Sequence, residues 1–215
     1  MGMSDVAVIK QKAEAGDAAA QVALGNALAS SFHANEALEW YRKAAVQGNI
    51  EGEYQVGDML LFGAHGIPNN LSVSPNQTEG IRWTFMAATN FHANACWNMA
   101  KALRQGLGAS TNLVAAYAWL SLYANTTSGS ILGRLKMNEL ALQLDTGAIR
   151  QAQNLAAQFK AGNWQAPLIR AIPEGESATV SVKPGTLTIK CLKIEKDSVL
   201  ITIEGEEAPR VLHLR

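Results

Sequence analysis

The side chains that most often do chemistry in proteins are few in this chain and lie far apart. Its four histidines are His33, His65, His92 and His213. They fall on different predicted elements, and no two have the His-x-x-x-His spacing that brings two imidazoles to one face of a helix. The histidines therefore predict neither a metal site nor a shared catalytic centre.

The chain also lacks the short motifs that position a nucleophile or a phosphate. There is no Gly-x-Ser-x-Gly turn and no phosphate-binding loop, and Gly106-x-Gly108 is interpreted as the turn of a helical hairpin. Glu36 and Glu39 flank a predicted helix start, where a solvated face is the simpler interpretation. We therefore expect a protein that is not an enzyme, with no catalytic residue, no metal and no cofactor.

The composition limits the partners of the chain. Its 215 residues include 18 basic and 18 acidic side chains, a balance that argues against nucleic acid or an anionic membrane as the main partner. No apolar run approaches the ~18 residues that cross a bilayer, and residues 1–17 do not have the pattern of a secretory signal. We expect no membrane insertion and a cytoplasmic location, or a periplasmic one if a signal has been removed. Cys96 and Cys191 lie in apolar runs and are expected to be buried thiols.

A tryptophan recurs in three similar stretches of the chain. They are ALEWYRKAAVQGN at 37–49, GIRWTFMAATNFH at 80–92 and AYAWLSLYANTT at 116–127. In each stretch a small residue precedes the tryptophan by three positions, and further small or aromatic residues follow it by four and five. These offsets lie on one face of an α-helix. The pattern predicts one helix design used three times, with Trp40, Trp83 and Trp119 buried between helices.

A second repeated element precedes each tryptophan helix. It reads AAAQVALGNAL at 18–28, IEGEYQVGDML at 50–60 and ANACWNMAKAL at 93–103. Its aligned small residues Gly25, Gly57 and Ala100 would let a partner helix approach closely. Each repeat is then an α-hairpin, and because one hairpin cannot cover its own apolar face, such units are expected to stack in series.

These residues resemble the Sel-one-like repeat (SLR) family, a relative of the tetratricopeptide repeat. The family pattern runs Ala-x-Ala-Gln-x-x-Leu-Gly and then Ala-x-x-Trp-x-x-x-Ala-Ala before a glycine. The first repeat matches it at Ala18, Ala20, Gln21, Leu24, Gly25, Ala37, Trp40, Ala44, Ala45 and Gly48. The resemblance covers roughly residues 13–126 and, more loosely, continues to about residue 163. It implies an α/α solenoid of about three hairpins that acts as a bacterial protein-interaction scaffold or adaptor.

The resemblance also implies a groove, because the first helices of such stacks line the concave side. Tyr54 and Trp97 occupy positions of these helices that point away from the core, and Asp58 and Lys101 follow one turn later. Aromatic side chains are enriched at binding hot spots, and the two charges could set the register of a bound chain. We predict a peptide-binding site of Tyr54, Asp58, Trp97 and Lys101. The alternative is that Tyr54 and Trp97 pack against the neighbouring repeat.

Two segments depart from the repeat pattern. The second repeat carries an insertion, HGIPNNLSVSPNQ at 65–77, which is either a tolerated surface loop or a partner contact. After the third repeat, residues 128–163 predict two helices without the tryptophan pattern. Asp145 and Thr146 stand where the cap of the second of these helices is expected. We interpret this pair as the cap of the array.

The C-terminal tail has the alternating pattern of strands. Leu187, Ile189 and Cys191 alternate, and Leu192 and Ile194 then alternate on the other parity, so a bulge is expected near Cys191–Leu192. The ending is similar to small β-modules of bacterial envelope and secretion proteins. We therefore predict a mainly α protein with a helical repeat domain at 4–163 and a small antiparallel β-module at 174–215. The alternative function is that this β-module mediates homodimerisation or docking to an envelope or secretion complex, with the helices as a spacer.

Overall fold

The computed structural model describes residues 3–63, 73–127 and 129–161, and the strand residues 177–182, 185–194, 198–203 and 210–213. The described helices are α1 Met3–Glu14, α2 Ala18–Ser30, α3 Ala34–Ala45, α4 Ile50–Phe62, α5 Gln77–Thr89, α6 Ala93–Gln105, α7 Leu113–Ala124, α8 Ser130–Ala141 and α9 Thr146–Lys160. The chain divides into two compact units, Met1–Ala157 and Gln158–Arg215, whose boundary lies inside α9. The predicted division into 4–163 and 174–215 stays a prediction.

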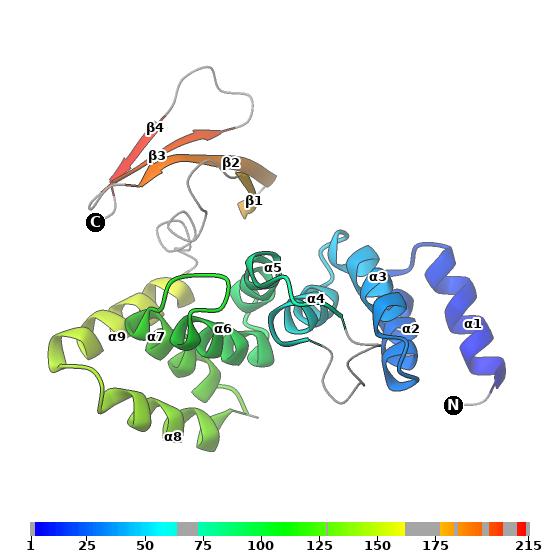
Figure 1. Ribbon diagram of the computed structural model, residues 1–215, viewed down its shortest axis with the longest axis horizontal. Coiled ribbons are helices and arrows are strands. Elements are labelled where there is room, and N and C mark those ends of the chain that lie inside the picture. The colour runs from blue at the N-terminus through cyan, green and yellow to red at the C-terminus, as the bar shows by residue number, and fades with distance from the viewer. Residues whose placement is uncertain are drawn as a thin grey trace. The chain divides into compact units, whose positions relative to one another are not determined.

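Helices α2 to α7 form three antiparallel hairpins that stack in chain order (Figure 1). Each hairpin packs a small-residue helix on a tryptophan helix: α2 on α3, α4 on α5 and α6 on α7. Helix α1 precedes the first hairpin and packs on α2, although the sequence pattern did not single it out. The prediction of a mainly helical repeat is confirmed for this part of the chain.

Side-chain caps fix where the first helix of each hairpin begins. Asp17, Asn49 and His92 each accept a hydrogen bond from the backbone N–H three residues later, at 2.8, 2.9 and 3.2 Å. Such caps satisfy N–H groups that have no partner inside the helix. The predicted cap of α9 is confirmed, because Asp145 Oδ1 accepts a hydrogen bond from the backbone of Ala148 at 2.7 Å.

Close backbone contact inside the second hairpin depends on glycine. A Cβ on Gly57 of α4 would come within 2.6 Å of the backbone nitrogen of Thr84 on α5. In the opposite direction, a Cβ on Gly80 of α5 would lie 2.8 Å from the backbone nitrogen of Leu61 on α4. Because real Cβ atoms do not approach so closely, these small residues set the distance between the two helices, as the sequence pattern predicted.

The prediction that all three repeat tryptophans are buried is correct for one of them. Trp119 is only 1% exposed. Trp40 and Trp83 are half-buried at the edge of the core, so for them the prediction of full burial is wrong. The reason is visible in their polar contacts: the amine of Lys43 lies 3.7 Å from the centre of a Trp40 ring, and Trp83 Nε1 donates to Glu79 Oε1 at 3.2 Å.

The residue that follows each tryptophan belongs to the buried interior of the helical stack. These residues are Tyr41, Thr84 and Leu120, which are all buried. Tyr41 packs closely on Gly25, and Thr84 packs on Gly57. The small residue of the first helix is therefore matched by the residue after the tryptophan, and the tryptophan itself lies beside this contact.

Beyond the third hairpin, α8 packs on α7. A Cβ on Gly133 of α8 would lie 2.7 Å from the Cα of Ala124, so the two helices touch closely. The predicted pair of capping helices is present as α8 and α9, but α8 ends at Ala141, before Leu142 and Leu144. Several exposed apolar side chains lie on or next to α8. They are Ile131, Leu132, Leu135 and Leu142.

The described residues of the C-terminal unit include four strands in one antiparallel sheet. They are β1 Ser177–Val182, β2 Gly185–Ile194, β3 Ser198–Ile203 and β4 Arg210–His213, in the order β1-β2-β3-β4. The register of β2 on β3 shifts between Cys191 and Lys193. That shift coincides with the position where the change of parity in the sequence predicts a bulge.

Most of the predicted 65–77 insertion lies outside the described residues.

Candidate functional site

One side of the helical stack is formed by the first helices of the hairpins. Helix α4 contacts α2 on one side and α6 on the other, whereas the second helices α3, α5 and α7 have fewer contacts with one another. We call the side on which α2, α4 and α6 meet the first-helix face. The four predicted peptide-binding residues belong to α4 and α6 of this face.

Tyr54 joins the second repeat to the third. Its ring stacks on the imidazole of His92, with ring centroids 4.5 Å apart and the planes 27° from parallel. Burial, together with the nearby carboxylates of Asp58 and Glu51, raises the pKa of Tyr54 to about 12. The phenol therefore stays neutral at physiological pH. This contact corresponds to the alternative interpretation, in which Tyr54 packs against the neighbouring repeat.

His92 has two bonds that fix its orientation beneath Tyr54. Its Nδ1 accepts the backbone N–H of Ala95, so the proton of the neutral ring is on Nε2. This Nε2 lies 3.1 Å from Glu51 Oε2 on α4 and donates to it. The hydrogen bond from His92 lowers the pKa of the Glu51 carboxyl. The start of α6 is therefore attached to α4 by both a ring stack and a hydrogen bond.

Asp58 and Lys101 also take part in contacts between α4 and α6. Asn98 Nδ2 donates to Asp58 Oδ1 at 2.8 Å. The amine of Lys101 lies 3.6 Å from the centre of the Phe62 ring, a cation–π contact. Both charged residues keep part of their surface exposed. Three of the four predicted site residues therefore connect neighbouring repeats.

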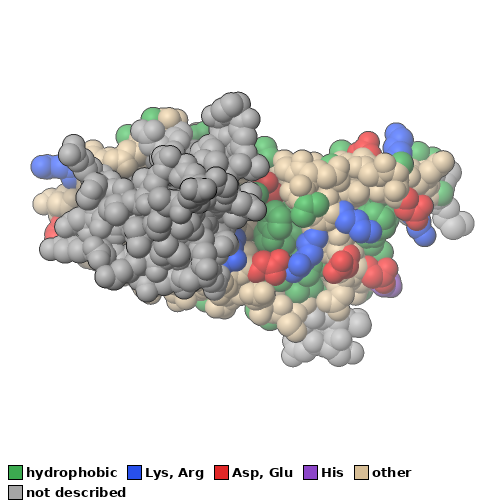
Figure 2. All heavy atoms as spheres, turned by 90° about the horizontal axis from the view of Figure 1, so that it is seen from above, with side chains coloured by type: hydrophobic (Ala, Val, Ile, Leu, Met, Phe, Trp, Pro, Cys, Tyr) green, Lys and Arg blue, Asp and Glu red, His purple; other side chains and the backbone are tan. Residues whose placement is uncertain are grey.

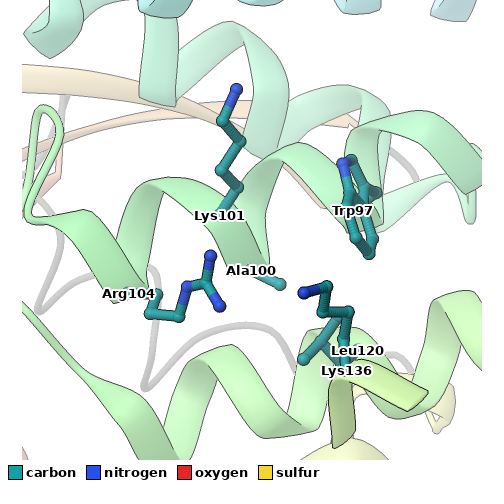
Figure 3. A pocket seen from close by; sticks show the side chains of 6 residues that line it. All are labelled: Trp97, Ala100, Lys101, Arg104, Leu120 and Lys136. Atoms are coloured by element: carbon teal, nitrogen blue, oxygen red, sulfur yellow. The ribbon is translucent and has the colours of Figure 1, made fainter. Parts of the chain in front are cut away.

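Trp97 differs from the other three, because it borders a cavity. Its ring packs on Tyr123 of α7 with centroids 5.1 Å apart, and the indole is half-buried. The cavity has a volume of about 200 Å³ (Figure 3). It is lined by Trp97, Ala100, Lys101, Arg104, Leu120 and Lys136. We call this space the Trp97 cavity.

Helices α6, α7 and α8 each contribute to the Trp97 cavity. The floor at Leu120 comes from α7, and Lys136 comes from α8. The space therefore lies where α6, α7 and α8 meet. Arg104 lies on the same face of α6 as Trp97 and Lys101, at helical spacing from both. The sequence could therefore have identified Arg104 as a further residue of the site. Leu120 and Lys136 could not be found in this way, because only tertiary packing brings their helices here.

The Trp97 cavity has an ion-pair cluster at its rim. Glu139 Oε2 lies 2.6 Å from the amine of Lys136, and Glu139 Oε1 lies 3.4 Å from Arg104 Nη1. The hydrogen bond from Lys136 lowers the pKa of the Glu139 carboxyl, and the charge of Arg104 lowers it further. On the part of the face in Figure 2 that is not grey, by contrast, acidic and basic side chains lie interspersed. The cavity is thus a local concentration of positive charge.

Two classes of site find no support in the described part of the chain. Across residues 3–63, 73–127 and 129–161 and the four strands, no three His, Cys, Asp or Glu side chains are grouped so as to hold a metal ion. Of the helices that the structure describes, none combines the length and the apolar character that a bilayer span requires. Cys96 is buried as expected, whereas nothing is described of the Cys191 side chain.

Two solved structures share this architecture. The crystal structure of c5321, a protective antigen present in uropathogenic Escherichia coli strains displaying an SLR fold, matches with a TM-score of 0.65 and 22% identity. The match covers 83% of this chain and 38% of c5321, so this chain spans well under half of that protein's length. A Sel1 repeat protein from Oxalobacter formigenes matches with a TM-score of 0.51 and 21% identity, over 64% of this chain and 99% of that one.

No protein-family model matches the sequence, and no curated protein matches it. The likeness of this chain to known proteins is therefore structural, and it agrees with the repeated residues of the sequence. The stacked hairpins, their small-residue contacts and these two neighbours lead to one conclusion: the chain is a helical repeat protein with the Sel-one-like repeat fold.

Proposed function

We propose that this chain is a scaffold that binds a peptide or an extended protein segment along its first-helix face, with Trp97 as the anchor. The observation that carries the proposal is the position of Trp97, half-buried beside a cavity of about 200 Å³. An aromatic side chain at the edge of a cavity offers a large contact area at a small cost in conformational entropy. A segment lying over α6 would extend this contact toward α4.

The other predicted residues have a supporting role in this proposal. Tyr54, Asp58 and Lys101 are half-buried, so each keeps some surface for a partner while it connects α4 to α6. A surface held in this way is already ordered before the partner arrives. Binding then costs less conformational entropy than it would at a flexible face.

The test is to select binding peptides against the full chain from a random displayed library and to measure the affinity of one selected peptide for variants. Trp97→Ala is expected to weaken binding at least tenfold. Trp40→Ala is the matched control, because Trp40 is also half-buried beside a lysine but lies on a second helix. Circular dichroism must show that both variants are folded. Equal binding by the wild type and folded Trp97→Ala would place the binding site elsewhere.

A second candidate function is homodimerisation, or docking to an envelope or secretion complex, through the C-terminal sheet. Support comes from the strand order, in which β1 and β4 are the outer strands and each pairs on one side within the described sheet. Outer strands have backbone groups that can pair with a further chain. Sedimentation at increasing concentration should show a dimer, and Val211→Pro in β4 should weaken it if β4 is the contact. A monomer at all concentrations would exclude the homodimer.

A further inference from the structure

We propose that the Trp97 cavity binds an acidic side chain of the partner segment, an Asp or Glu carboxylate flanked by an apolar residue. This inference rests on the proposed function and specifies its partner chemistry. The binding groups are Arg104 and Lys136, with Trp97 and Leu120 as the apolar wall. The charge of the lining, the direction of its side chains and an ion pair already present all support this assignment.

The charge of the lining favours an anion. Three of its six residues are basic and none is acidic. The chain as a whole has a formal net charge of zero, so the excess is local. Glu139 at the rim neutralises one of the three cations. Complementary charge across an interface gives specificity and speeds association, so an acidic segment is preferred over a neutral or basic one.

The side chains of the lining separate into two directions. Arg104 and Lys136 extend into the space beside Ala100, whereas Lys101 extends away from them toward α4 (Figure 3). This direction agrees with the contact between the Lys101 amine and the Phe62 ring. Two cations from different helices thus face the same space, and they are the pair that a carboxylate would bridge.

Glu139 shows the kind of ligand that this pair accepts. Its carboxylate contacts Lys136 at 2.6 Å and Arg104 at 3.4 Å, so one carboxylate already bridges both cations. The second distance is long for a charge-assisted hydrogen bond. The Glu139 side chain is also 47% exposed, which makes it easy to displace into water. We infer that Glu139 occupies the place of the ligand carboxylate until a partner segment replaces it.

The size of the cavity limits the occupant. About 200 Å³ is smaller than the roughly 300–1,000 Å³ of typical small-molecule pockets. One or two side chains of a longer segment fit this space better than a whole small molecule does. The apolar wall of Trp97 and Leu120 adjoins the cations, so the residue next to the carboxylate should be apolar.

The experiment uses the full chain and fluorescein-labelled peptides of defined sequence. The first probe is Gly-Leu-Glu-Glu-Leu-Gly with an amidated C-terminus, and its matched control replaces both Glu residues by Gln. Anisotropy titration should show the acidic probe binding at least tenfold more tightly, with the difference shrinking as salt is raised. Equal affinity for the two peptides would overturn the inference.

Variants locate the binding to the cavity. The double variant Arg104→Gln/Lys136→Gln should bind the acidic probe about tenfold more weakly and leave the neutral probe unchanged. The matched control is Lys12→Gln/Arg150→Gln, which removes one Lys and one Arg from exposed positions on α1 and α9. An equal loss of affinity in this control would mean that binding depends only on the net charge of the protein. That result would overturn the assignment of binding to the cavity.

The variant Glu139→Gln gives the sharpest readout, because it removes the competing carboxylate. It should raise the affinity for the acidic probe severalfold, an effect that general structural damage would not produce. Unchanged or weaker binding would overturn the role given to Glu139. A peptide with Gln side chains and a free C-terminal carboxylate tests the other source of the anion. Preference for that peptide would overturn the assignment to a side chain.

Failure of this inference differs from failure of the proposed function. If peptides selected from the library bind in a Trp97-dependent way but carry no acidic residue, the scaffold function stands and the acidic preference is wrong. If selected peptides bind with no dependence on Trp97, the proposed site on the first-helix face is wrong as well.

Discussion

The side-chain amide of Gln21 donates a hydrogen bond to the carbonyl oxygen of Ala13, eight residues earlier, at 3.1 Å. The same relationship recurs in the third hairpin, where Cys96 Sγ lies 3.8 Å from the carbonyl oxygen of Ala88. In both cases a buried polar side chain at the start of a first helix reaches the end of the preceding helix. This position connects each hairpin to the helix before it.

Glu53 occupies the equivalent position in the second hairpin, four residues after the capping residue Asn49. It is 3% exposed, and its Oε2 has no hydrogen-bond partner within the described part of the chain. Burial raises the pKa of Glu53 to about 7. A protonated carboxyl can donate a hydrogen bond as Gln21 does, whereas a carboxylate cannot.

The first prediction concerns the pH dependence of stability. Since the folded pKa of Glu53 is raised from 4.5 to about 7, the free energy of unfolding should fall as pH rises through this window and level off above it. Glu53→Gln should remove this dependence and stabilise the protein above pH 7, by at most about 3 kcal/mol. Urea denaturation across this pH range measures it. A variant less stable than the wild type on the alkaline side would contradict the assignment.

The second prediction concerns the contact between α4 and α5. Gly57→Ala should lower the free energy of unfolding by about 1–3 kcal/mol, because its Cβ would overlap the backbone of Thr84. The loss is expected although Ala is the better helix former by ~1 kcal/mol. Gly147→Ala is the control, since its Cβ would approach only the Asp145 side chain. Thermal unfolding with equal midpoints for both variants would refute the close packing.

The third prediction separates the three repeat tryptophans. Trp119→Ala should cost about 3–5 kcal/mol, because this ring is buried and packs edge-on against Phe85 with centroids 5.8 Å apart. Trp40→Ala and Trp83→Ala should each cost less, since both rings are half-buried. Denaturant titration of the three variants gives the ranking. If Trp40→Ala lost as much stability as Trp119→Ala, Trp40 would contribute as much to the core as Trp119 does, contrary to this prediction.

The fourth prediction concerns the stack between Tyr54 and His92. Tyr54→Ala should lower the free energy of unfolding by about 1–3 kcal/mol, because it removes both the ring stack and buried apolar area. Tyr54→Phe keeps the ring and should lower the free energy of unfolding by less than half as much. Comparing the two variants by denaturation separates ring packing from the hydroxyl. Equal losses would assign the effect to the hydroxyl instead.

Local patterns in the sequence were enough to predict the repeat helices and the pair that follows them, though not α1. The repeated tryptophans and small residues predicted the hairpins, because a helical period of 3.6 places them on one face. Asp145 was predicted as a cap because its side chain bonds to a backbone group three residues away. Each of these inferences depends on interactions within one helix or between neighbours in the chain, and such interactions are visible in the spacing of residues.

The tertiary structure decided which predicted residues face solvent. Spacing placed Tyr54, Asp58, Trp97 and Lys101 on matching faces, but it did not show that α6 would pack on α4 and engage three of them. For the same reason it placed Trp40 in the core, where the structure leaves it half-buried. Periodicity identifies a face of a helix, whereas the residues that cover the α4 face belong to a helix about forty residues further along the chain.

The Trp97 cavity is the clearest case of what tertiary packing alone decides. Trp97 and Arg104 lie on one stripe of α6 and could be paired from the sequence. Leu120 and Lys136 come from two later helices, and no spacing rule connects them to α6. Whether Lys136 reaches the cavity depends on where α8 packs. The close contact of Gly133 with Ala124 helps to set that position. The sequence by itself determined the repeat and its helices, and the packing of successive hairpins determined the site, because a cavity is a property of several surfaces at once.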